Sequence, residues 1–60
     1  MRTCREIERA IKDEKEAFDM YDRLAARVPY PTRRRIISIR DDERRHREIL
    51  EEIHKALCGY

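Results

Sequence analysis

The chain has 60 residues, of which 47% are charged and 40% hydrophobic, and its net charge at neutral pH is only +2. This length permits one small domain, and so short a chain needs a disulfide, a metal ion or a partner chain to support its core. No apolar run is long enough to span a membrane, and residues 1–10 contain no apolar signal segment. We therefore expect a cytoplasmic protein without membrane contact.

The first predicted helix covers about residues 3–28. Its inward residues recur at alternating spacings of three and four, which places them on one helical face. They are Cys4, Ile7, Ile11, Glu14, Phe18, Tyr21, Ala25 and Val28. Ala10, Ala17 and Leu24 widen this face beyond what one partner helix covers. Pro29 ends the helix, because a proline disfavours helical geometry in the residue before it.

A second helix is predicted from about residue 32 to about residue 58, after a short turn at residues 29–31. Its inward face follows the same spacing. The members are Ile36, Ile39, Glu43, His46, Leu50, Ile53 and Leu57. Gly59 suits a left-handed cap at the end of this helix. The predicted fold is all-α, a single antiparallel helical hairpin that spans residues 1–60.

Both helices have apolar faces too broad for a lone hairpin, which provides only half of a core. Two copies packed together would form a four-helix bundle and close both faces. We therefore expect a homodimer or a larger homo-oligomer.

Cys4 and Cys58 are expected near the two open ends of the hairpin. Counted from the turn, they differ by only about two residues, or about 3 Å of helical rise, so a bond between them is within reach. Three alternatives stay open at this point. They are an intrachain disulfide, two free thiols in a reducing cytosol, and an interchain bridge.

Three polar residues interrupt the apolar faces: Glu14 in the first helix, and Glu43 and His46 in the second. Counted from the turn near residue 30, they are 16, 13 and 16 residues away. An antiparallel hairpin therefore places them at nearly the same level. Buried polar groups need partners, and a carboxylate needs a cation, so we interpret the three as one site.

The chemistry of this set is that of a metal site. Glu43 and His46 are three residues apart, so both point inward from one helical turn. Glu14 approaches from the neighbouring helix, and a two-fold dimer would provide four carboxylates and two imidazoles. Four carboxylates balance the charge of two divalent ions, and a shell rich in oxygen with one imidazole per ion favours iron or manganese.

The pattern resembles the ferritin-like di-iron carboxylate superfamily, which includes rubrerythrins, bacterioferritins and encapsulated ferritins. In that superfamily a Glu is followed seven residues later by Tyr, and the next helix carries Glu-x-x-His. This chain has Glu14 and Tyr21 in EKEAFDMY, and Glu43 and His46 in DDERRH. The resemblance implies that Glu14, Glu43 and His46 bind two iron ions per dimer. It also implies ferroxidase-type oxidation of Fe(II) by dioxygen or peroxide.

Two more residues acquire a role from the resemblance. Tyr21 would donate a hydrogen bond to a ligating carboxylate or act as a local reductant. Asp42 corresponds to an Asp of designed two-helix di-iron proteins, which supports the histidine of a neighbouring helix.

Other interpretations compete with the metal site. A second Glu-x-x-His, Glu51 to His54, lies off the apolar face, and we expect His54 to be a surface or boundary residue. A metal-free helical interaction module would use the same apolar faces. The arginines of residues 33–47 would suit a nucleic acid, but acidic residues interrupt them, so we regard nucleic-acid binding as the weaker alternative.

Overall fold

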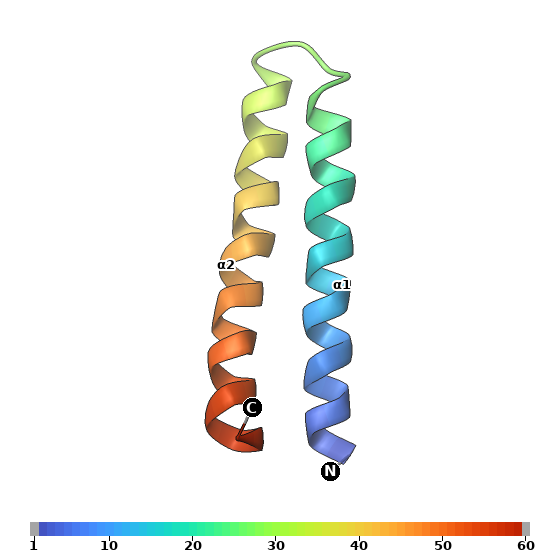
Figure 1. Ribbon diagram of the computed structural model, residues 1–60. Coiled ribbons are helices and arrows are strands. Elements are labelled where there is room, and N and C mark those ends of the chain that lie inside the picture. Colours follow the sequence, from blue (N-terminus) through green and yellow to red (C-terminus); the bar gives the residue numbers. More distant parts are fainter. Residues whose placement is uncertain (1, 60) are drawn as a thin grey trace.

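The computed structural model describes residues 2–59, which form two antiparallel helices joined by a short turn (Figure 1). Helix α1 extends over Arg2–Ala25 and helix α2 over Thr32–Cys58. The helices lie side by side, so both ends of the chain meet at one end of a rod of 44 × 14 × 13 Å. The predicted all-α hairpin is confirmed. Neither helix is long and apolar enough to cross a membrane, within the described residues.

Helix α1 ends at Ala25, three residues before the predicted boundary at Val28. The backbone N–H of Arg27 donates to the carbonyl of Leu24 at 3.0 Å, and that of Val28 donates to Ala25 at 3.4 Å. These bonds join residues three apart instead of four, which is the tighter 3₁₀ pattern, and they come just before Pro29.

Arg33 of α2 stabilises this end of α1. Its Nε donates to the carbonyls of Ala25 and Val28, each at 2.9 Å, and its guanidinium lies 5.1 Å from the ring centre of Tyr30. Carbonyls at a helix C-terminus lack intrahelical donors. The side chain therefore satisfies groups that the early end of α1 leaves open.

Gly59 ends α2 as predicted. Its φ of 79° is left-handed, and its N–H donates to the carbonyl of Lys55 at 3.1 Å. Glycine adopts this conformation without steric cost. At the other end of α2, Thr32 follows a cis peptide bond between Tyr30 and Pro31.

The inward face of α1 agrees with the prediction. Every predicted member from Cys4 to Val28 is buried or half-buried, and so are the three flanking residues Ala10, Ala17 and Leu24. The spacing of apolar residues therefore identified the correct face of α1 over its whole length.

The inward face of α2 differs from the prediction. Ile39, Ile53 and Leu57 are 42–52% exposed, although Ile36 and Leu50 are half-buried. A row at intervals of seven residues, which we call the basic row, is buried or half-buried in addition to the predicted apolar members. Its members are Arg33, Arg40, Arg47 and His54.

The contacts of the basic row explain why α2 is rotated about its own axis relative to the orientation that its apolar spacing predicts. Arg40 donates to Asp22 of α1 at 2.7 Å, and its guanidinium lies 5.4 Å from the ring centre of Phe18. Arginine can cover an apolar surface with its stem while its charged end is paired. The basic row is therefore part of the contact between helices, and the apolar members beside it are displaced outward.

The hairpin alone buries little. Cys4, Ala25 and His54 are the buried residues of the described chain, and no large side chain is fully buried. The accessible surface is 4847 Å², whereas a compact protein of 7.4 kDa has about 4,200 Å². Apolar surface is therefore left open on this rod.

Cys4 and Cys58 lie together at the open end of the hairpin. Their Sγ atoms are 2.01 Å apart and their Cα atoms 6.1 Å apart. Of the three alternatives left by the sequence, this geometry fits the intrachain disulfide. Its formation in solution stays a prediction.

Candidate metal centre

The predicted residues Glu14, Glu43 and His46 come together near the middle of the rod. Each offers one ligand atom, and these atoms all lie within 4.8 Å of one another. Glu14 comes from α1, and Glu43 and His46 lie one turn apart on α2. The antiparallel alignment of the helices therefore produces the juxtaposition that the count from the turn predicted.

The group lies at the edge of the contact between helices. The Glu14 side chain is 23% exposed, whereas that of His46 is 52% exposed. His46 Nδ1 lies 3.9 Å from Glu14 Oε2, beyond hydrogen-bond distance. The site is therefore covered on the α1 side and open on the side of His46.

The two carboxyl groups affect one another. The pKa of Glu14 is raised above its ordinary value of 4.5, firstly by a hydrogen bond with Glu43, then by burial and by the negative charge of Glu43. His46 acts in the opposite direction and lowers the pKa of Glu14. Glu14 thus holds a proton more readily than an isolated carboxyl group does.

A metal ion fits this donor set. Oε2 of Glu14 is buried and has no hydrogen-bond partner among the described residues. A buried oxygen without a partner is costly, and a cation beside it would remove that cost. Two carboxylates and one imidazole suit iron or manganese, and they leave coordination positions free.

Tyr21 and Asp42 lie near this group along their helices. Tyr21 is half-buried, two turns after Glu14 on the same face of α1. Asp42 is half-buried beside Glu43, and it accepts a hydrogen bond from Arg45 of its own helix. The roles that the resemblance implies for these two residues stay predictions.

The expectation for the second Glu-x-x-His was wrong in one respect. His54 is 8% exposed and faces α1, where its Nε2 lies 3.8 Å from Oε2 of Glu8. His54 belongs to the basic row, and the rotation of α2 that brings this row against α1 buries it. The carboxylate opposite His54 was overlooked because Glu8 lies outside the apolar face of α1.

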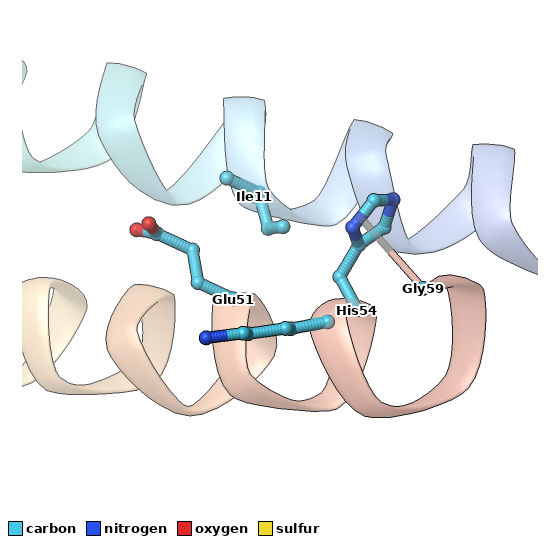
Figure 2. Close-up of a pocket in the computed structure, with 5 residues that line it drawn as sticks. Ile11, Glu51, His54 and Gly59 are labelled. Carbon is cyan, nitrogen blue, oxygen red and sulfur yellow. The ribbon is translucent and has the colours of Figure 1, made fainter.

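This second motif does not form a group of three ligands. An open pocket of about 500 Å³ is lined by Ile11, Glu51, His54, Lys55 and Gly59 (Figure 2). In Figure 2 the carboxylate of Glu51 points away from the ring of His54. Oε1 of Glu51 lies 3.0 Å from Nε of Arg47. Within residues 2–59, the Glu14–Glu43–His46 group is the cluster that meets the distance requirement for a metal.

The sequence reasoning missed the basic row as an inward feature. The signal was present, because residues 33, 40, 47 and 54 are spaced by seven. Such spacing keeps residues on one side of a helix. The positive charge of its three arginines had suggested a surface for nucleic acid instead.

A two-helix hairpin with this carboxylate and histidine group has the features of a ferritin-like half bundle. The family model for rubrerythrin matches residues 6–59. The chain therefore belongs to the rubrerythrin family, within the ferritin-like di-iron superfamily, whose domains typically bind iron. No curated protein and no solved structure gave a significant match.

Proposed function

We propose that two copies of this chain bind two iron ions through Glu14, Glu43 and His46 and oxidise Fe(II). The observation that carries the proposal is the convergence of these three ligands within 4.8 Å at the level predicted from the turn. Membership of the rubrerythrin family supports iron as the metal. Manganese fits the same oxygen-rich donor set.

Each ligand residue would have a role in metal binding that follows from its position in the hairpin. Glu43 and His46 hold one ion from a single turn of α2, and the Glu14 carboxylate binds from α1 after it loses its proton. Fe(II) is the substrate, and the two ions together give two electrons, which with two protons reduce one dioxygen to hydrogen peroxide or one hydrogen peroxide to two waters. The open side at His46 admits the oxidant, while α1 keeps the Glu14 side covered.

A homodimer completes this site. One hairpin provides two carboxylates, whereas two hairpins provide four and balance two divalent ions. The dimer would also cover the apolar surface that a lone hairpin leaves open, as a four-helix bundle. Larger assemblies built from this dimer are compatible with the same site.

Anaerobic titration of the metal-free protein with Fe(II) tests the proposal, with the molar mass followed in parallel. We expect saturation near two irons per dimer and a coloured product when dioxygen or peroxide is admitted. The His46→Ala variant should lose tight binding, because each ion then loses its only imidazole.

His54→Ala provides the matched control, since it removes the histidine of the other Glu-x-x-His motif. We expect it to lower stability and to keep the stoichiometry of iron binding. Equal loss of iron binding in both histidine variants would contradict the assignment of the site.

A metal-free interaction module is the second candidate. The exposed residues Ile39, Ile49 and Ile53 favour it, because they would support assembly whatever the metal does. A stable dimer without tight iron binding, and with the same melting temperature in the presence and absence of Fe(II), would select this function.

Nucleic-acid binding is less well supported by the geometry. Arg33 and Arg40 contact α1, and Arg45 is paired with Asp42. Binding to DNA that weakens with salt and survives His46→Ala would favour this function.

A further inference from the structure

The two cysteines at the open end of the hairpin differ in their surroundings. Cys4 lies in the first turn of α1 and is 4% exposed, whereas Cys58 is the last residue of α2 and is half-buried. An external thiolate can open a disulfide at either sulfur, and access decides which sulfur it reaches. Solvent reaches Cys58 more readily than Cys4.

Open space lies beside Cys58. The next residue, Gly59, lines the open pocket of about 500 Å³ together with Lys55 (Figure 2). Apart from its chain neighbours, no described residue has an atom within 4 Å of the point where a side chain would begin on Gly59. A small molecule can therefore approach the end of α2 without moving either helix.

The charges around this pocket favour an anion. The carboxylate of Glu51 is paired with Arg47, because its Oε1 lies 3.0 Å from the arginine Nε. Lys55 is exposed and forms no salt bridge within residues 2–59. Its positive charge is left to attract a negatively charged visitor, such as a thiolate that also carries carboxylates.

The ends of the helices determine which sulfur leaves more easily. Cys4 lies at the end of α1 where backbone N–H groups lack intrahelical partners, and the first turn contains no acidic residue. This end of a helix stabilises negative charge, whereas the C-terminal end that carries Cys58 does not. A sulfur that is better stabilised as a thiolate leaves faster. Access and charge thus select the same direction of attack.

We propose that the Cys4–Cys58 pair is a site of thiol–disulfide exchange with small anionic thiols. The thiolate enters beside Gly59 and Lys55 and attacks Sγ of Cys58. A mixed disulfide forms there, the bond between the two cysteines breaks, and Cys4 leaves as the thiolate.

A second thiol completes the reduction. Its thiolate attacks the sulfur of the first thiol in the mixed disulfide, so that Cys58 leaves and a small disulfide is released. Two electrons pass to the protein, and its two cysteines take up the two protons that the small thiols lose. The reverse reaction with the small disulfide restores the bond. Exchange therefore ties and unties residues that are 54 apart in the chain.

Trapping of the mixed disulfide tests the direction of attack. The metal-free protein is oxidised with oxidised glutathione, treated briefly with glutathione, quenched with acid and alkylated. Peptide masses should show glutathione on Cys58 and the alkyl group on Cys4, about tenfold or more in excess over the opposite pattern. Glutathione mainly on Cys4 would overturn the proposal, and so would the absence of a disulfide after the oxidation.

The dependence of the reduction rate on urea separates exchange in the folded protein from exchange after unfolding. Below the unfolding transition the rate with glutathione should stay nearly constant, because the attack does not require unfolding. A rate that rises in proportion to the unfolded fraction would identify a purely structural disulfide and overturn the proposal.

Lys55→Ala tests the route of entry. It should slow reduction by glutathione about two- to fivefold and leave reduction by the neutral thiol 2-mercaptoethanol unchanged, since only the charged thiol is attracted. Lys15→Ala, which removes an exposed lysine of α1, is the control and should change neither rate. Equal rates of Lys55→Ala and Lys15→Ala with glutathione would overturn entry beside Lys55. All three experiments use the protein without metal, so their outcome is independent of the iron titration.

Discussion

Glu14 is the residue at which the proposed metal binding and the stability of the metal-free fold would oppose each other. Its carboxyl group is largely covered, contacts Glu43, and has a buried oxygen without a hydrogen-bond partner in the described chain. An apolar or neutral polar residue would suit this position better in the absence of metal. The unfavourable placement is understandable if a cation normally lies there.

The raised pKa of Glu14 predicts how the stability of the metal-free protein depends on pH. The folded protein retains a proton that the unfolded chain loses near pH 4.5, so stability is highest below that value and falls as the pH rises through the folded pKa. Urea unfolding midpoints between pH 4 and 8 measure this loss. Glu14→Gln should remove it, since the amide does not titrate.

Glu16→Gln is the control for this experiment, because Glu16 is exposed on the same helix. It should show the pH dependence of the parent protein. If Glu14→Gln also follows the parent curve, Glu14 does not contribute the predicted pH dependence.

At the scale of the helices, the rotation of α2 decides which residues are inside. The apolar spacing of α2 predicts one face, but the basic row adds a second set of inward residues beside it. The predicted apolar face of α2 is therefore only partly covered. Ile36 and Leu50 are half-buried, whereas Ile39 and Ile53 are exposed and available to another molecule.

Arg33→Ala should destabilise the hairpin by about 1–2 kcal/mol. The change removes a charged donor from the carbonyls of Ala25 and Val28 and leaves both without that partner. Thermal or urea unfolding measures the difference, and Arg34→Ala, at an exposed neighbouring position, is the matched control. Equal stability of the two variants would show that Arg33 does not support the end of α1.

At the scale of the whole molecule, Cys4 and Cys58 lie within bonding distance at the open end of the hairpin. Cys4 and Cys58 are 54 residues apart, and the bond between them would close nearly the entire chain into a loop. A cytoplasmic setting favours thiols, whereas an oxidising one favours the bond. The redox state of these two cysteines therefore affects the stability of a chain with so small a core.

If the disulfide forms, we expect the oxidised protein to be much more stable against unfolding than the reduced protein. Closing a loop of this length stabilises by about 4 kcal/mol in the chain-entropy description. Thermal unfolding of the parent protein with and without reductant should show this difference. In the Cys4→Ser/Cys58→Ser variant, reductant should have no effect. A parent protein whose mass shows two free thiols after exposure to air would contradict the bond.

The sequence by itself determined the hairpin, the inward face of α1 and the level shared by Glu14, Glu43 and His46. These features depend on local periodicity, on the proline that ends the first helix, and on counting from a short turn. Such quantities are contained in the order of residues.

Only the tertiary structure decided which side of α2 meets α1. Periodicity places residues on a face, but the rotation of that face depends on contacts between helices. Arg40 with Asp22 and His54 beside Glu8 are contacts of this kind. These contacts join residues from different helices, so the spacing within either helix does not reveal them. They bury His54 and leave His46 exposed.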